Sequence, residues 1–366
     1  MSLPPPLERI PPQVASLADY EPLARERMSE PAWAYLNGGS GDEWTLRENV
    51  AAFSRIPLRS RVLRDMADAS TKISLLDAEL AAPILLAPIA FQKLAHPDGE
   101  LASVIAAGAL DTAMVVSTQA SISLEEIAAH ARSLLWFQLY IQTDRDFTAA
   151  LVRRAEQAGY RALVVTVDAP VNGLRNREQR AGTALRAGME AVNLQGMRTP
   201  PPPSPETLLF GTPLLAAAPT WTDLAWLRGL TRLPILLKGI TEPADAARTI
   251  EAGMDGIIVS NHGGRTLDGV RATVELLPEI VETADGAVPV LMDGGIRRGN
   301  DILRAIALGA TAVLVGRPYV HALAAAGAPG VAHVLRLLRA ELELAMTLTG
   351  CATIADIDRA VLVRGA

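Results

Sequence analysis

Residues 289–318 read PVLMDGGIRRGNDILRAIALGATAVLVGRP, and this stretch decides the expected fold. It contains a short apolar run (289–293), a turn with glycines and arginines, an amphipathic segment (299–309) that ends in Leu-Gly, and a second apolar run (312–316). Runs of Val, Ile and Leu without polar alternation are typical of strands buried on both faces of a parallel sheet. A glycine commonly ends a helix. The stretch therefore predicts a strand, a helix and a second strand.

The same pattern recurs from residue 83 onward. The apolar runs cover residues 83–88, 112–117, 134–140, 162–168, 234–238, 256–260, 289–293 and 312–316. Between them lie Ala-rich amphipathic stretches such as 145–159 and 243–253. Eight strands alternating with helices predict an α/β fold, a (β/α)8 TIM barrel. No Gly-x-Gly-x-x-Gly follows the first strand to support the alternative, a doubly wound open sheet.

Two segments depart from the repeat. Residues 1–82 are expected to form an N-terminal helical cover packed on the barrel, which itself spans 83–366. After the fourth strand a long insertion, about 171–221, contains TPPPPSP (199–205), which cannot be regular helix or strand. Loops of this length within a compact domain are typically lids or disordered connectors, and we expect a lid.

The composition is that of an ordinary globular protein. The 366 residues are 49% hydrophobic and 20% charged, which excludes global disorder and collagen-like repeats. Cys351 is the only cysteine, so no internal disulfide forms and nothing argues for an oxidising compartment. The net charge of −6 leaves no overall basic footprint for nucleic acid. With no apolar run of about 18 residues and no signal-peptide pattern, we expect a soluble cytoplasmic protein.

Polar side chains follow most of the expected strands, and in this architecture active sites lie at the carboxyl ends of the strands. In chain order these ends carry Pro88, Ile89 and Ala90; Ser117 and Gln119; Gln138 and Tyr140; Thr166 and Asp168; Lys238; Ser260 and His262; Asp293 and Gly295; and Gly316 and Arg317. The return of polarity at a strand end explains some of them. It does not explain Lys238, which is costly to bury without an anionic or electron-rich partner.

The loops after the last two strands predict a phosphate site. DGGIRRG (293–299) and GRP (316–318) place glycines and arginines on the loops that bind phosphate in many barrels. Glycines let backbone N–H groups approach an anion, and Arg297 and Arg317 add charge-assisted hydrogen bonds. A phosphate site explains two such loops on adjacent strands better than a need for tight turns alone.

His262 lies in SNHGGR (260–265), just past the sixth strand. The glycines leave room for a ligand, and the nearby Arg265 favours an acid/base role beside an anionic substrate. The other four histidines show no metal-ligand spacing, so we expect no metal. The Gly-x-Ser-x-Gly elbow typical of a Ser-His-Asp hydrolase is absent from the sequence, which disfavours that class of enzyme.

Residues 15–355 resemble the FMN-dependent α-hydroxy acid oxidases and dehydrogenases, the group of glycolate oxidase, lactate oxidase and mandelate dehydrogenase. The matching segments are GGSGDEWTL (38–46), APIAFQKLAHPDGE (87–100), WFQLY (136–140), TVDAP (166–170), LKG (237–239), SNHGGR (260–265) and DGGIRRG (293–299). Each is weak alone, and their joint presence in this order is specific.

The resemblance implies a set of substrate contacts. His262 would be the base, oriented by Asp168, and Tyr140 would hydrogen-bond the substrate hydroxyl or the developing carbonyl. The groups implied to hold the substrate carboxylate are Arg265, Arg175 and Tyr35.

It also implies the contacts of FMN. Lys238 would lie at the N1/C2 edge of the flavin and stabilise the anionic reduced ring. The other implied cofactor-binding residues are Pro88, Ile89, Ala90, Ser117, Gln138, Thr166, Ser260, Asp293, Gly295, Arg297, Gly316 and Arg317.

Three positions matter for comparison with the family. Gln119 replaces a bulky aromatic of plant glycolate oxidase, so the pocket would accept a different or larger substrate side chain. Leu174 stands where many members have an arginine, which selects Arg175 and keeps Arg177 as a substitute. Ala90 favours oxidase behaviour over monooxygenase behaviour.

The sequence thus predicts FMN-dependent oxidation of a small L-2-hydroxy acid to the 2-keto acid, with oxygen favoured over a quinone as acceptor and a homotetramer as the assembly. One alternative is an isomerase-like FMN barrel, which the Arg265, Arg175 and Tyr35 set disfavours. Another is a membrane-associated, quinone-linked dehydrogenase, in which residues 208–218 would dock on a bilayer. That segment is short, uncharged and not clearly amphipathic, so we do not expect membrane docking.

Overall fold

The computed structural model describes residues 3–182, 189–198, 209–210 and 212–363 of the chain. Within these residues eight parallel strands close into a barrel, in the order β10-β3-β4-β5-β6-β7-β8-β9. The strands are β3 (Ile84–Leu86), β4 (Ala113–Ser117), β5 (Leu135–Leu139), β6 (Leu163–Thr166), β7 (Ile235–Ile240), β8 (Gly256–Val259), β9 (Val290–Asp293) and β10 (Ala312–Val315). The TIM-barrel prediction is confirmed. Only β7 extends past its expected end, by two residues with a register shift between Lys238 and Ile240.

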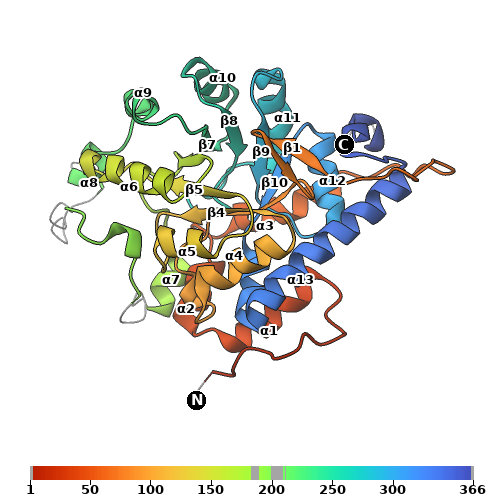
Figure 1. Cartoon of the computed structure of the whole chain (residues 1–366), viewed down its shortest axis with the longest axis horizontal. Helices are drawn as coiled ribbons and strands as arrows, with labels where there is room; N and C mark the ends of the chain where they lie inside the picture. Colours follow the sequence, from red (N-terminus) through yellow and green to blue (C-terminus); the bar gives the residue numbers. More distant parts are fainter. Residues whose placement is uncertain (1–2, 183–188, 199–208, 211, 364–366) are drawn as a thin grey trace.

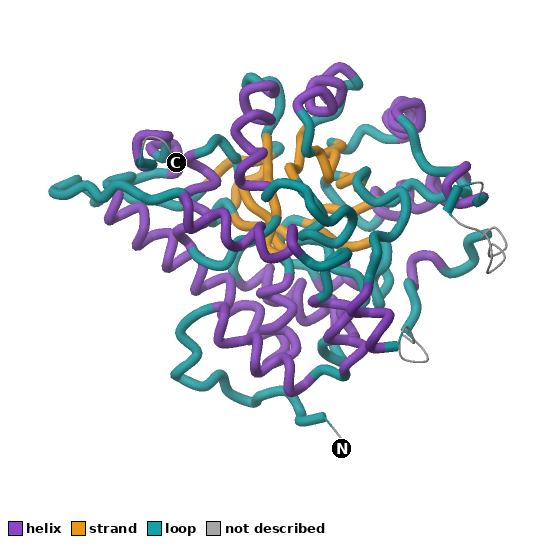
Figure 2. Tube along the Cα trace, turned by 180° about the vertical axis from the view of Figure 1, so that it is seen from behind, coloured by secondary structure: helices purple, strands orange, loops and turns teal. Residues whose placement is uncertain are grey.

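Helices surround the strands, which lie together at the centre of the molecule (Figure 2). They are α4 (Gly99–Ala109), α5 (Leu124–His130), α6 (Arg145–Gln157), α9 (Trp221–Leu230), α10 (Pro243–Glu251), α11 (Thr273–Ala284), α12 (Gly299–Ala307) and α13 (Arg317–Thr349), which is interrupted at Ala326 and Gly327. Alternate strand residues such as Ile84, Met114 and Phe137 pack outward against this layer. The remaining strand residues fill the barrel interior, which explains why the runs are apolar throughout.

The N-terminal segment folds into helices α1 (Tyr20–Arg27), α2 (Glu30–Asn37) and α3 (Trp44–Ala51), followed by an antiparallel hairpin of β1 (Ile73–Leu75) and β2 (Ala78–Leu80). Helix α1 packs against α13, beside it at the lower side of Figure 1. Leu75 and Leu80 of the hairpin join the cluster of side chains that fills the barrel. The hairpin was not expected from the sequence, because each of its strands has only three residues.

The long insertion after β6 is described in part. Its described elements include helix α7 (Asn176–Ala181), which lies against α2, and a short helix α8 (Pro213–Ala216). The TPPPPSP stretch, with its Pro200–Pro203 run, lies outside the described residues, as does part of the 208–218 segment. Short 3₁₀ turns occur at Leu17–Asp19, Ala52–Arg55, Gln92–Leu94, Val192–Leu194, Ile354–Asp356 and Arg359–Val361. Among the described helices, none combines the length and the apolar character needed to cross a bilayer.

Candidate active site

A cavity of about 440 Å³ opens at the carboxyl ends of the barrel strands. Residues that follow all eight strands line it, together with Tyr35 and Leu36 from α2 and Arg175 and Glu178 beside and on α7. Of the residues singled out from the sequence, those that line it are Tyr35, Pro88, Ile89, Ala90, Ser117, Gln119, Gln138, Tyr140, Thr166, Arg175, Lys238, His262, Arg265, Asp293, Gly295, Arg297, Gly316 and Arg317. Asp168 and Ser260 lie behind this wall and line an adjoining cavity instead.

His262 is held from behind by Asp168, with 2.9 Å between Nδ1 and Oδ1. Burial lowers the pKa of His262, and the nearby Lys238 adds to this, although Asp168 opposes it. Burial disfavours ionisation of Asp168, but His262 and Lys238 together hold the pKa of this carboxyl below its ordinary value. An ionised Asp168 only accepts hydrogen bonds, so we assign the imidazole proton to Nδ1. The Nε2 atom of a neutral ring is then free to accept a proton on the cavity side.

Lys238 is an ammonium group buried at the other end of the cavity, with the residue only 4% exposed. Its Nζ lies 3.1 Å from Oδ2 of Asp293 and 2.9 Å from Oγ of Ser260. Ser260 in turn donates to Oδ1 of Asp293 at 2.7 Å. Burial disfavours the charged form, but Asp293 and Asp168 outweigh it and raise the pKa of Lys238. Asp293 is therefore the anionic partner that the buried lysine requires.

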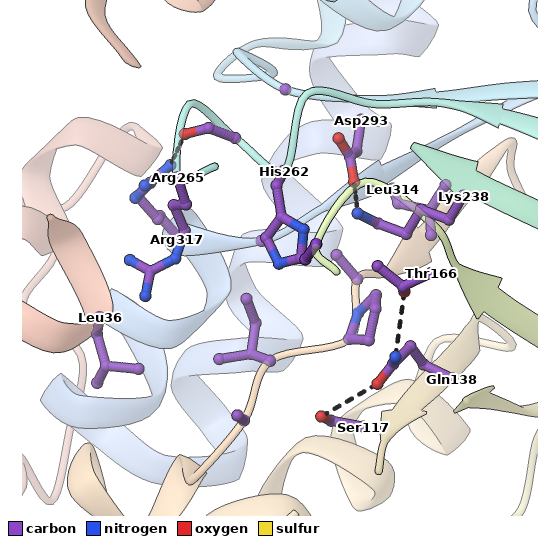
Figure 3. A pocket seen from close by; sticks show the side chains of 18 of the residues that line it. Leu36, Ser117, Gln138, Thr166, Lys238, His262, Arg265, Asp293, Leu314 and Arg317 are labelled. Atoms are coloured by element: carbon purple, nitrogen blue, oxygen red, sulfur yellow. Dashed lines mark hydrogen bonds and ion pairs between the residues drawn. The ribbon is translucent and has the colours of Figure 1, made fainter. Parts of the chain in front are cut away.

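Three polar side chains form a row along the neighbouring strand ends β4, β5 and β6. Gln138 donates from Nε2 to Thr166 at 3.1 Å and accepts from the backbone N–H of Thr118 at 3.1 Å. Ser117 completes the row at 3.4 Å from Oε1 of Gln138. Figure 3 shows this row and Lys238 on one side of the cavity, Arg265 and Arg317 on the other, and His262 between them.

The arginines of the cavity are partly buried and contact mostly neutral acceptors. Arg265 donates to the carbonyl oxygens of Tyr35 and Gly38, both at 2.7 Å, and Arg317 donates to those of Gly263 and Gly38 at 3.0 and 3.1 Å. The Nε atom of Arg317 is buried without a partner.

Electrostatics disfavour these cations in the absence of an anion. Burial and the neighbouring Arg175 lower the pKa of Arg265 to about 10. Burial and the charges of Arg265 and Arg297 hold the pKa of Arg317 well below its ordinary value. Burial also lowers the pKa of Arg297. Such a group of cations is suited to anionic ligands.

The structure separates the two candidate arginines of the insertion. Arg175 lines the cavity, donating from Nη1 to Glu178 at 2.9 Å and from Nε to the carbonyl of Arg265 at 2.9 Å. Arg177 instead pairs with Glu43 and does not line the cavity. Arg175 immediately precedes α7 and Arg177 is its second residue, and side chains two positions apart do not face each other.

Glu178 was not singled out from the sequence. It lies three residues after Arg175, a spacing typical of a helical ion pair, and this was the available signal. Its place in the cavity depends on how the insertion folds, which spacing alone does not give.

Two tyrosines complete the wall near His262. Burial raises the pKa of Tyr140 to about 12, so its hydroxyl keeps its proton and can donate a hydrogen bond. Burial also raises the pKa of Tyr35, whose ring lies 5.4 Å from the guanidinium carbon of Arg265.

Comparison with known proteins assigns the family. A model of the FMN-dependent dehydrogenase family matches residues 24–364. The chain belongs to this family. It is 49% identical to an L-lactate oxidase of Nostoc sp., over 95% of the chain and 97% of the relative. It is 42% identical to a peroxisomal (S)-2-hydroxyacid oxidase of Arabidopsis thaliana, over 95% and 96% of the two chains. A solved structure of mandelate oxidase with benzoyl-formic acid superposes with a TM-score of 0.87, at 44% identity, and covers 94% of this chain and 97% of that one.

The family assignment confirms the resemblance seen in the sequence and the prediction of FMN as cofactor. The cavity is suited to FMN. Its volume lies within the range of about 300–1,000 Å³ typical of cofactor and ligand sites. The buried, unpartnered Nε of Arg317 suits a phosphate.

A second feature of the cavity also fits a phosphate-bearing cofactor. Gly295 has a φ of 84°, and a Cβ there would lie 1.9 Å from the carbonyl oxygen of Asn49. Only glycine lets the 293–299 loop pack this closely on α3, and the loop presents Gly295 and Arg297 to the cavity.

Proposed function

We propose that the protein oxidises a small L-2-hydroxy acid to the corresponding 2-keto acid and that oxygen is the final electron acceptor. One observation carries the proposal. A partly buried His262 with a lowered pKa, held by Asp168, shares one cavity with the guanidinium groups of Arg175 and Arg265. A proton acceptor beside a carboxylate-binding pair is the arrangement that a 2-hydroxy acid requires.

Binding of the substrate carboxylate falls to Arg265, Arg175 and Tyr35. The planar guanidinium groups match the two carboxylate oxygens, and Tyr35 adds a hydroxyl donor. Both arginines are anchored by backbone carbonyls, so little side-chain conformational entropy is lost when the substrate binds.

Proton transfer falls to His262. Its Nε2 accepts a proton from the hydroxy acid, and Asp168 stabilises the resulting imidazolium through Nδ1–H. Tyr140, which stays protonated, donates to the oxygen that becomes the carbonyl. FMN, when bound, would supply the two-electron redox chemistry that links the hydroxy acid to oxygen, and oxygen with two electrons and two protons gives hydrogen peroxide.

The residues that would hold FMN divide by chemistry. Lys238 would stabilise the negative charge of the reduced ring, and Asp293 and Ser260 keep that lysine in place. The phosphate would contact Gly295, Arg297, Gly316 and Arg317. The ring would contact Pro88, Ile89, Ala90, Ser117, Gln138 and Thr166.

Gln119 bears on the choice of substrate. It lines the cavity beside Tyr140, and the relatives act on hydroxy acids of different size, as the names lactate oxidase and mandelate oxidase say. We propose that the pocket accepts 2-hydroxy acids whose α-carbon carries a group larger than the hydrogen of glycolate. The homotetramer and the cytoplasmic location stay predictions from the sequence.

The test is a substrate panel on the purified holoprotein. L-lactate, glycolate and (S)-mandelate are added without oxygen, and the flavin absorbance is followed. At least one should bleach the flavin, and air should then restore it with release of peroxide. If no 2-hydroxy acid bleaches the flavin, the proposed activity is wrong. If only a quinone restores the spectrum, the proposal of oxygen as the acceptor is wrong.

A further inference from the structure

Glu178 is a carboxylate inside a cavity that we assign to carboxylate binding. Its side chain is 20% exposed, and its Oε1 accepts from Nη1 of Arg175 at 2.9 Å. The same oxygen lies 3.5 Å from Nη2 of Arg265. Glu178 therefore contacts both guanidinium groups from which a substrate carboxylate would accept hydrogen bonds.

The fold fixes Glu178 through contacts that involve no ligand. It belongs to α7, which packs on α2, the helix that carries Tyr35. Arg177 on the same short helix pairs with Glu43, next to the start of α3. The backbone N–H of Gly41 donates to the carbonyl of Leu174 at 2.8 Å, just before the helix. The carboxylate is thus built into the cavity wall.

The charges around Glu178 indicate two opposing effects. Arg175 and Arg265 repel one another, and Arg175 contributes, after burial, to the lowered pKa of Arg265, whereas Glu178 acts in the opposite direction. Without a ligand, Glu178 neutralises one charge and keeps the two guanidinium groups together. With a ligand bound, two carboxylates share the same two cations and repel one another. Substrate and product carry the same carboxylate, so this repulsion weakens the binding of both.

We propose that Glu178 is a positioning residue that holds Arg175 beside Arg265 and lowers the affinity of the site for carboxylates, so that the 2-keto acid is released. The inference rests on the proposed function, because it takes the two arginines as the carboxylate-binding pair. The Glu178 carboxylate thus competes with the carboxylates of the substrate and the product for the same two arginines.

Two substitutions separate the charge of Glu178 from its hydrogen bond. Glu178→Gln keeps an oxygen that accepts from Arg175 and removes the charge. The Kd of pyruvate and the KM of the hydroxy acid should both fall by about tenfold, the effect of one close like charge. Glu178→Ala also removes the acceptor, so Arg175 keeps only its hydrogen bond to the carbonyl of Arg265, and KM should rise about tenfold above that of Glu178→Gln.

The measurement is titration of pyruvate into the oxidised holoprotein, by calorimetry and by the flavin spectrum, alongside steady-state kinetics. Glu190→Gln is the matched control, because Glu190 is an exposed carboxylate of the same insertion that pairs with Gln195. It should leave the Kd of pyruvate and the KM unchanged. Flavin content and Tm verify that each variant folds, and Glu178→Gln decides the question even if Glu178→Ala does not fold.

The outcomes distinguish this inference from the function on which it rests. A wild-type protein that turns over a hydroxy acid, with an unchanged or higher Kd of pyruvate in Glu178→Gln, overturns the role of Glu178 alone. Equal KM values in the Gln and Ala variants do the same. A wild-type protein whose flavin no hydroxy acid reduces overturns the proposed function and this inference with it.

Discussion

His262 occupies a backbone conformation that few residues with a side chain adopt. Its φ is 57°, and Gly263 and Gly264 follow with positive φ values as well. Such a conformation costs about 1–3 kcal/mol and persists where the surrounding structure imposes it. Here it turns the imidazole between Asp168 and the cavity. The strain supports a role in which the direction of the ring matters more than local stability.

Asp168→Asn tests how much the carboxylate contributes to proton transfer. Asparagine has a similar shape but does not stabilise an imidazolium, so the rate of flavin reduction should fall by about 10²–10⁴-fold. KM should change little, because Asp168 does not line the substrate cavity. Anaerobic stopped-flow absorbance measures the rate of flavin reduction and steady-state kinetics measure KM, with the exposed Asp245→Asn on α10 as the control. A reduction rate close to that of the wild type would contradict the role.

The pH dependence follows from the lowered pKa of His262. Only the neutral imidazole accepts a proton, so kcat/KM falls as the pH drops through this pKa. Burial and Lys238 place that pKa below 6.5, and Asp168 stays ionised there because its own pKa is also lowered. The acid limb of kcat/KM should thus be centred below the ordinary histidine pKa of 6.5. Profiles of kcat/KM between about pH 4.5 and 8 measure this, and an acid limb centred above pH 7 would refute it.

At the scale of elements, the loops that follow β6 and β8 meet at Gly173. A Cβ on Gly173 would lie 2.3 Å from the carbonyl oxygens of both Arg265 and Thr266. This close approach joins the loop that carries Arg175 to the one that carries Arg265. The two arginines are therefore neighbours because one position between the loops has no side chain.

Gly173→Ala should separate these loops. We expect KM for the hydroxy acid to rise by at least about tenfold, since a displacement near 1 Å can cost 10²-fold in rate. Steady-state kinetics measure the change, and flavin content should stay normal because Lys238 and Arg317 are untouched. Gly229→Ala is the matched control, since a Cβ there meets nothing within 4 Å in α9. Unchanged KM in Gly173→Ala would show that the loops tolerate the separation.

Elements also show where prediction from the sequence succeeded and where it stopped. The barrel strands were predictable because both faces are buried, which leaves continuous apolar runs, as in β4 and β5. The β1–β2 hairpin was not, since each three-residue strand buries only its last side chain fully. The position of Asp168 behind His262, and of Glu178 in the cavity, depends on contacts between loops that are distant in sequence.

At the scale of the whole molecule, charge is distributed unevenly. The chain carries a net charge of −6, yet Arg265, Arg297 and Arg317 lie partly buried at one end of the barrel. At the opposite end, the hairpin packs Leu75 and Leu80 into the barrel interior. The cationic residues and the apolar closure of the barrel interior therefore lie at opposite ends of the barrel. The cations repel one another until anions bind among them, which couples the stability of the protein to its ligands.

Removal of FMN should for this reason lower the stability of the entire protein. A ligand that binds only the folded state adds about 2.7 kcal/mol at 100 times its Kd, so the protein stripped of FMN should have a lower Tm than the holoprotein. Arg317→Met should shrink this Tm difference, because FMN loses a charged partner and its Kd rises by about 10-fold or more. Differential scanning fluorimetry with and without added FMN measures the difference, with Arg336→Met, an exposed position on the same helix α13, as the control. A Tm difference in Arg317→Met as large as in the wild type, at the same FMN concentration, would show that Arg317 does not hold the phosphate, because the difference then follows the Kd of FMN.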